Sequence, residues 1–169
     1  MQMDMFNATV PVFDRMLGSM QTWIGIAREH ARTKGFDESV YLTLRLAPDM
    51  LPLPRQIQIA SDGAKGAVAR LSGQEVPSWA DTEVTLDDLL ARLQKTRDYV
   101  NSFKPEQING SEQREVTVPR RQGDPFKFSG EDFLRFFATP NLYFHATTLY
   151  ALLRHAGVPL GKMDFLGSR

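Results

Sequence analysis

The chain has 169 residues, of which 42% are hydrophobic, so it is long enough to form one folded domain with a sizeable core. Twenty basic and twenty acidic residues cancel, which leaves no overall field to attract nucleic acid or an anionic membrane. The absence of cysteine excludes a disulfide framework, a thiolate nucleophile, and cysteine-ligated zinc or iron–sulfur sites. We therefore expect one soluble domain over residues 1–169, with neither nucleic acid nor membrane as a partner.

The first residues show no basic region followed by an apolar run, and no stretch approaches the roughly 20 apolar residues of a membrane span. A cytoplasmic location is the expectation. The one basic run, Pro119-Arg120-Arg121, is short, has no interleaved aromatic residues and precedes Asp124. We interpret it as a solvated loop and not as a nucleic-acid site.

The first predicted helix follows Thr9, a candidate N-cap, with Pro11 in its first turn and Gly35 as its stop. Its apolar residues fall three or four positions apart and form one stripe: Phe13, Met16, Leu17, Met20, Trp23, Ile24 and Ala27. A stripe of this kind is typical of a helix that packs on a core.

Residues 36–54 contain three prolines and are interpreted as a connector with a short helix near residues 38–44. The second predicted helix has Pro54 in its first turn and ends before Gly73. Its main stripe consists of small and aliphatic residues, which allow close approach of another helix: Ile57, Ala60, Ala64, Ala67, Val68 and Leu71.

Residues 74–83 lack a helical period and predict a loop. Thr85 and Asp88 resemble a capping box at the start of a third helix, whose apolar positions continue to Phe103. Residues 115–118 and 126–128 alternate on either side of a turn at 122–124, which predicts a small β-hairpin.

Ser129, with Asp132 three residues later, is the expected cap of the last helix, which ends at Gly157. Pro140 removes the amide that would bond to the Phe136 carbonyl, which predicts a kink or break. Four helices of this length predict an all-α fold, an up-down four-helix bundle with the hairpin before the last helix.

The three histidines fall into two groups. His155 lies in the last turn of its helix, where it complements the helix dipole, and His30 lies on a polar face between Glu29 and Arg32. We interpret both as structural. His145 differs because Asn141 lies one turn before it on the same face.

An i,i+4 pair such as Asn141 and His145 can touch one ion or one ligand. The alternative is a buried histidine that Asn141, Tyr143 or a backbone carbonyl satisfies. The second predicted helix carries a similar polar pair, Gln58 and Asp62, away from its alanine stripe. A pocket lined by both pairs is one interpretation, and a solvated helix edge at Gln58 and Asp62 is the other.

Two segments carry a family resemblance. The sequence PNLYFHATT at residues 140–148 leads into LLRHAGVP at 152–159 and Asp164-Phe165. This region resembles the closing helix of the DinB/YfiT-like metalloenzyme superfamily, which commonly carries His-x-x-x-His, then Leu-Arg-x-x-Gly-Val-Pro and an Asp-Phe tail. The segment LAPDMLPL at 46–53, followed by Arg55-Gln56, resembles an uncharacterised branch of that superfamily, a domain of unknown function.

The resemblance implies a four-helix bundle, often dimeric, with a divalent-metal pocket at one end. It places His145 on the second family histidine, Asn141 on the first, and Gln58 near the third ligand, with Asp62 one turn on. Because amide oxygens bind nickel or zinc more weakly than imidazole does, such a metal site would be degenerate. Some members of the superfamily resemble metal-dependent thiol S-transferases or isomerases.

Two functions remain open from the sequence. One is a divalent-metal-dependent enzyme of the transferase or isomerase type, with nickel or zinc and a thiol cosubstrate, because the chain has no cysteine of its own. The other is a non-catalytic small-ligand-binding or structural bundle that has lost the metal. A homodimer is expected from the resemblance, with the aromatic stretch at residues 126–137 as a candidate surface.

Overall fold

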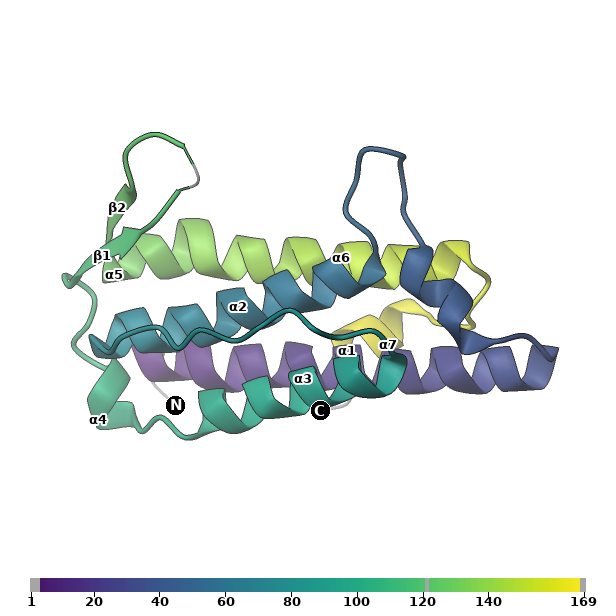
Figure 1. Ribbon diagram of the computed structural model, residues 1–169. Coiled ribbons are helices and arrows are strands. Elements are labelled where there is room, and N and C mark those ends of the chain that lie inside the picture. Colours follow the sequence, from purple (N-terminus) through teal and green to yellow (C-terminus); the bar gives the residue numbers. More distant parts are fainter. Residues whose placement is uncertain (1–3, 121, 168–169) are drawn as a thin grey trace.

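The structure, a computed structural model, describes residues 4–120 and 122–167. Four long helices lie side by side and form the body of the molecule: α1 (Met5–Lys34), α2 (Leu53–Ser72), α3 (Leu86–Asn101) and α6 (Thr139–His155) (Figure 1). The helix α2 packs against α3 and α6, and α1 also contacts both of them. The structure confirms the predicted all-α bundle with a hairpin before the last helix.

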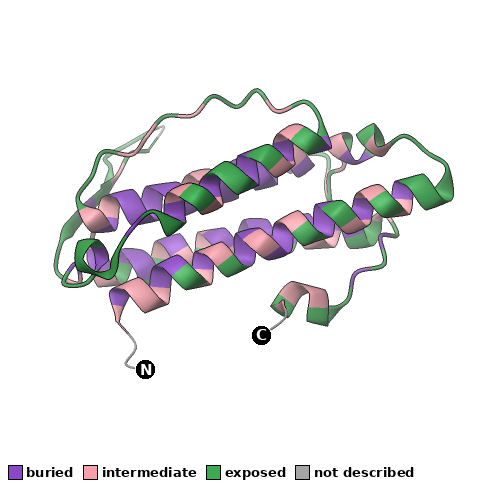
Figure 2. Cartoon of the chain, turned by 90° about the horizontal axis from the view of Figure 1, so that it is seen from below, coloured by how far each residue is buried: buried purple, intermediate pink, exposed green. Residues whose placement is uncertain are grey.

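The core lies between the inward faces of these four helices (Figure 2). Its largest fully buried side chains include Trp23, Tyr41 and Phe13. Ala60, Ala64 and Ala67 of α2 are fully buried, so the predicted stripe of small residues does face the neighbouring helices.

The helix α1 begins earlier than the sequence analysis predicts. Asp4 is the N-cap, and its carboxylate accepts a hydrogen bond from the Asn7 amide at 2.8 Å. Thr9 is buried inside the helix, where its hydroxyl donates to the Met5 carbonyl. The N-cap assignment to Thr9 is therefore wrong, because Asp4, five residues upstream, caps the helix, which continues through Pro11. Gly35 ends the helix as predicted, with a φ of 76°.

Short elements connect the long helices. The helix η1 (Glu38–Thr43) lies within the predicted connector, and α4 (Pro105–Ile108) follows α3. Thr85 and Asp88 form the predicted capping box of α3. The segment 74–85 has no helix or strand and runs lengthwise over α2 and α3 (Figure 1).

The hairpin pairs β1 (Glu115–Val118) with β2 (Phe126–Ser129) in antiparallel register, with Val116 opposite Phe128. This confirms the predicted hairpin and both of its strands. Gly130 follows at once, and a Cβ atom there would lie 2.0 Å from the Ser111 carbonyl oxygen. Only glycine fits this close approach, which joins the hairpin to the last helical segment.

The last helical segment is continuous but irregular. It runs through α5 (Gly130–Asp132), the π-helical turn η2 (Phe133–Ala138) and α6, and Ser129 caps it as predicted. The Thr139 amide donates to the Leu134 carbonyl, five residues earlier. Pro140 therefore follows a widened turn instead of a break, and this widening absorbs the clash of its ring with the Phe136 carbonyl.

The C-terminal helix α7 (Lys162–Leu166) packs on α1. The Trp23 indole N–H donates to the Asp164 carbonyl at 2.9 Å, and the Trp23 ring stacks on Phe165 with 5.4 Å between ring centroids. Asp164 and Phe165, the Asp-Phe pair noted in the sequence, thus hold α7 against the bundle.

Candidate functional site

His145 lies where α6 packs against the start of α2, and it is only 8% exposed. Its Nδ1 atom is 2.8 Å from the side-chain oxygen of Gln56. The Gln56 side-chain nitrogen in turn donates to the Leu51 carbonyl at 2.8 Å. Because a backbone carbonyl only accepts, the Gln56 amide must present its oxygen to His145. Nδ1 of His145 therefore carries a proton and donates it to Gln56.

Burial lowers the pKa of His145 below the ordinary value for histidine, so the ring is neutral at pH 7. With its one proton on Nδ1, the neutral ring has a lone pair on Nε2. Within residues 4–120 and 122–167 the structure records no hydrogen-bond partner for Nε2. This nitrogen can accept a hydrogen bond from a ligand or bind a cation.

Asn141 lies one turn before His145 and also faces α2. A Cβ atom at Gly63 would lie 3.0 Å from the side-chain nitrogen of Asn141. Gln56 and Gly63 are seven residues apart, which places them on one face of α2. The structure thus brings His145, Asn141 and Gln56 to the face of α2 that packs against α6.

Gln58 and Asp62 lie on another side of α2, toward α3 and the segment 74–85. The same oxygen of Asp62 accepts from Arg92 at 2.9 Å and lies 2.8 Å from the Lys65 ammonium. The helical rotation of about 100° per residue separates this side from the face that carries Gln56. The structure therefore divides the four predicted site residues into two pairs.

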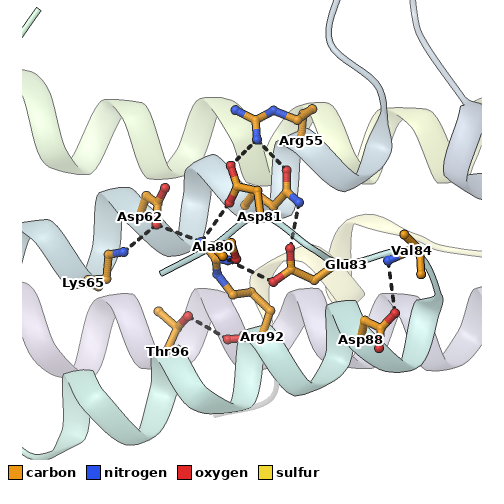
Figure 3. Close-up of polar contacts among 11 residues, drawn as sticks. Arg55, Asp62, Lys65, Ala80, Asp81, Glu83, Val84, Asp88, Arg92 and Thr96 are labelled. Carbon is orange, nitrogen blue, oxygen red and sulfur yellow. Dashed lines mark hydrogen bonds and ion pairs between the residues drawn. The ribbon is translucent and has the colours of Figure 1, made fainter. Parts of the chain in front are cut away.

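Arg92 is the centre of the second group. Its side chain is 2% exposed, and its guanidinium donates to the Asp62 carboxylate of α2 and to the Ala80 carbonyl, Asp81 and Glu83 of the segment 74–85 (Figure 3). Gln58 donates to Glu83 at 2.8 Å and accepts from Arg55, which also pairs with Asp81. We call the following residues the Arg92 cluster: Arg55, Gln58, Asp62, Lys65, Asp81, Glu83 and Arg92.

The Arg92 cluster holds the segment 74–85 on the bundle. The Lys65 ammonium lies 4.4 Å from the centre of the Trp79 ring, so an aromatic side chain covers this buried cation. Burial alone would raise the pKa of Glu83, but its hydrogen bonds with Gln58 and Arg92 and the charge of Arg92 together outweigh burial and lower this pKa. Through these contacts Gln58 and Asp62 help to attach the segment 74–85 to the helices.

This donor set does not fit one divalent ion shared by the four residues. The Asp62 oxygen already has two cationic groups within 2.9 Å, and both ends of the Gln58 amide are engaged. Within the described ranges no group of three or more His, Asp or Glu side chains could hold a metal ion. The metal assignment of His145, Asn141, Asp62 and Gln58 stays a prediction.

Sequence reasoning missed Gln56 and Arg92. A signal existed for both, because each is a polar residue at a buried position of an apolar stripe. Gln56 lies four residues before Ala60, and Arg92 lies three after Leu89 and eight before Val100. Nothing in the sequence paired Arg92 with the acidic residues of the preceding loop.

Other candidate features lie outside these two groups. His155 is exposed, as its interpretation as a helix-end residue predicts. The Arg120 guanidinium lies over the Phe126 ring at 4.5 Å, whereas Arg121 of the same basic run lies outside the described residues. Over the described part of the chain, no helix combines the length and apolar character needed to cross a membrane.

Comparison with known proteins places the chain in a family. A model of a domain of unknown function, DUF1993, matches residues 5–166. The crystal structure of a DinB family member protein from Shewanella denitrificans is similar, with a TM-score of 0.87 and 38% sequence identity over 97% of this chain and 92% of that one. No protein of curated function matches. The chain therefore belongs to the DUF1993 family, a domain of unknown function, within the DinB family.

Proposed function

We propose that this protein binds a small polar molecule at His145 and uses Gln58 and Asp62 to stabilise its own fold. The pairing of Asp62 with both Arg92 and Lys65 carries this proposal. A guanidinium stays protonated in proteins, so Arg92 is a permanent cation beside the carboxylate. The pocket of this protein then has one imidazole and no carboxylate ligand.

Electrostatics disfavour a divalent ion at Asp62. Two unit charges 4 Å apart interact by about 4 kcal/mol at an effective dielectric constant of 20, and Arg92 and Lys65 would both repel the ion. Displacing them from Asp62 would leave the buried Lys65 ammonium without its carboxylate and would remove one of the three carboxylates that pair with Arg92, which is destabilising. A ligand that carries no positive charge avoids this cost.

His145 defines the class of ligand. Its neutral ring offers the Nε2 lone pair, and Asn141 beside it offers an amide that can donate or accept. A surface hollow of about 400 Å³ lies beside His145: its lining does not include His145 itself but does include Phe144 and Thr148, which flank it on α6. We infer a small molecule with an O–H, N–H or S–H group, and a thiol cosubstrate belongs to this class.

A divalent-metal-dependent transferase or isomerase is the second candidate. One observation favours it. Gln56 accepts a hydrogen bond from Nδ1–H of His145, and metal-bound histidines commonly donate in the same way to a neighbouring group that does not itself touch the metal. A nickel or zinc ion bound at Nε2 would act as a Lewis acid on a thiol or water. The cytoplasm, where thiols stay reduced, is the location that we propose for either function.

The two candidates differ in metal content. Protein purified without a histidine tag would be analysed for nickel and zinc by mass spectrometry and titrated with each ion by calorimetry. We expect no stoichiometric metal in wild type or in Asp62→Asn, and a lower Tm for His145→Ala. Stoichiometric metal that His145→Ala loses, with an unchanged Tm of the metal-free protein, would establish the second candidate. His155→Ala, at an exposed position, is the control.

We also propose that the protein is a homodimer. Phe136 and Phe144 lie on η2 and α6 and are 65% and 58% exposed, and Phe126 of β2 is 41% exposed. The hairpin and the connector at residues 44–52 project past α6 on the same side of the bundle (Figure 1). Exposed aromatic side chains of this kind are typical of surfaces that bind another protein chain.

A further inference from the structure

A second concave site lies away from the residues discussed so far. It is a groove of about 650 Å³ between the C-terminal half of α1 and the turn that follows α6. Gly25 and Ile26 of α1 line one side, and Gly157 and Pro159 line the other. His30 is the one imidazole in this lining. The volume is within the range of small-molecule sites.

Tyr41 determines which nitrogen of His30 carries a proton. The Tyr41 hydroxyl is 2.7 Å from Nδ1 of His30, and the tyrosine is buried, which raises its pKa and keeps it protonated. Within the described residues the structure records no other acceptor for the buried Tyr41 hydroxyl, so in the neutral ring this hydroxyl donates to Nδ1 and the ring proton lies on Nε2. In the charged ring both nitrogens carry protons. Nε2 of His30 is therefore a hydrogen-bond donor in both charge states.

The structure records no acceptor for this Nε2–H group within residues 4–120 and 122–167. Gly157 lies beside this group at the groove, and an added Cβ atom there would lie 4.0 Å from Nε2. Gly157 has a φ of +85°, a backbone conformation that disfavours a side chain, so this wall of the groove stays open. The donor thus lies beside a lining residue that leaves room for a ligand.

Gly25 is the second unusual feature of the groove. It lies within the 30-residue helix α1, where glycine is less favourable than alanine. An added Cβ atom there would meet nothing within 4 Å, so packing within the protein does not require glycine. A ligand that approaches the helix backbone would require it.

We propose that this groove binds a small, mostly apolar, neutral molecule whose carbonyl oxygen accepts from His30 Nε2–H. The apolar part would lie on Gly25, Ile26 and Pro159. An anion is disfavoured because α1 and α6 both end at the groove, and the C-terminal ends of helices carry negative partial charge. The lining does not favour a cation either, because its two charged residues, Glu29 and Lys34, have opposite signs and Nε2–H of His30 is a donor.

Acetophenone and ethylbenzene form a matched pair of probes, because they differ by the carbonyl group. Each would be titrated into ¹⁵N-labelled protein, together with benzoate as the anionic probe. The amide signals of Gly25, Ile26 and Gly157 and the ring ¹⁵N signals of His30 would be followed by NMR. We expect acetophenone to shift these signals and to bind about fivefold more tightly than ethylbenzene, as one neutral hydrogen bond predicts.

Gly25→Leu places a side chain in the groove and leaves His30 itself unchanged, so it should abolish these shifts. Ala91→Leu, on the exposed face of α3, is the matched control and should leave them unchanged. Circular dichroism would show that both variants keep the fold. Equal binding of the two neutral probes, tighter binding of benzoate, or acetophenone shifts that persist in Gly25→Leu would each overturn the proposal.

Discussion

Two histidines of this protein are held in opposite hydrogen-bonding states by their neighbours. Gln56 accepts from Nδ1 of His145 because the Leu51 carbonyl fixes the orientation of the Gln56 amide. Tyr41 instead makes Nδ1 of neutral His30 an acceptor. A single neighbouring side chain thus decides whether each neutral ring offers a lone pair or a proton at Nε2.

Replacing Gln56 with methionine tests the first of these arrangements. Gln56→Met keeps the length of the side chain but leaves the Leu51 carbonyl and the His145 Nδ1–H group without their partner. We expect a loss of about 1–3 kcal/mol of unfolding free energy, which is the cost of an unsatisfied buried polar group. Urea denaturation measures this loss, and ¹⁵N NMR should show that the proton is no longer confined to Nδ1. Gln74→Met, at an exposed position, should change neither property.

The depressed pKa of His145 also predicts how stability depends on pH. Burial disfavours the charged His145 ring in the folded state, whereas in the unfolded chain this histidine has its ordinary pKa near 6.5. Below that pH the unfolded state binds more protons, so the free energy of unfolding falls as the pH is lowered toward the folded-state pKa. Chemical denaturation should therefore show that the free energy of unfolding of the wild type decreases from pH 7.5 to pH 5, and that this decrease is smaller in His145→Gln. If His145→Gln and wild type show the same pH profile, His145 does not titrate as burial requires.

Among the elements, the segment 74–85 owes its position to polar contacts. It contains no helix or strand, yet Ala80, Asp81 and Glu83 all bond to Arg92 (Figure 3). A buried ion pair adds little net stability compared with an apolar pair, but removing one partner leaves the other charge uncompensated. The attachment of this segment therefore depends on one arginine of α3.

The change Arg92→Met should destabilise the protein by about 3 kcal/mol, because it leaves the buried carboxylate of Glu83 without its cation. It should also make the segment 74–85 sensitive to proteases, since Asp81 loses a contact as well. Chemical denaturation and limited proteolysis with mass spectrometry measure the two effects. Arg135→Met breaks an exposed pair with Glu131 and should cost no more than about 0.5 kcal/mol. Equal losses in the two variants would show that burial of Arg92 is unimportant.

The elements that the sequence predicts best are those with local signals. The capping box of Thr85 and Asp88, the glycine at the end of α1 and the alternating hairpin strands all depend on neighbouring residues. The π-helical turn before Pro140 has no such signal, because a proline predicts an irregularity but not its form. Local patterns therefore determine the element order but not the shape of each helix.

The candidate site is less predictable because it depends on helix rotation. The family resemblance placed the polar partner of His145 near Gln58, whereas Gln56 is the residue in contact. Two residues correspond to about 200° around a helix, so this small offset moves a side chain to the opposite side. Gln58 and Asp62 therefore face the Arg92 cluster, whose acidic members come from a loop without regular structure. Long-range ion pairs of this kind leave no pattern in the sequence.

At the scale of the whole molecule, most of the aromatic residues near the hairpin pack on one another. Phe128, Phe133 and Phe137 form close ring pairs, and Phe133 is buried. Phe136 and Phe144 form no close ring pair with this group within the described residues, and both are exposed. The predicted aromatic surface at residues 126–137 is thus divided between the core and the outside. The exposed part continues along α6 past the predicted range.

The proposed homodimer should depend on this exposed part. In a two-fold symmetric dimer the same surface of both copies meets, so one substitution introduces two charges into the interface. We expect light scattering to give the mass of a dimer at micromolar concentration for wild type and the mass of a monomer for the double variant Phe136→Asp/Phe144→Asp. Because both side chains are exposed, the thermal unfolding of the monomeric variant should remain cooperative. Thr147→Asp is the control, because Thr147 is exposed on the same helix as Phe144. This variant shows whether any added negative charge on α6 is sufficient to dissociate the dimer. A wild-type protein that is monomeric at this concentration contradicts the dimer, and a double variant that remains dimeric places the interface on another face.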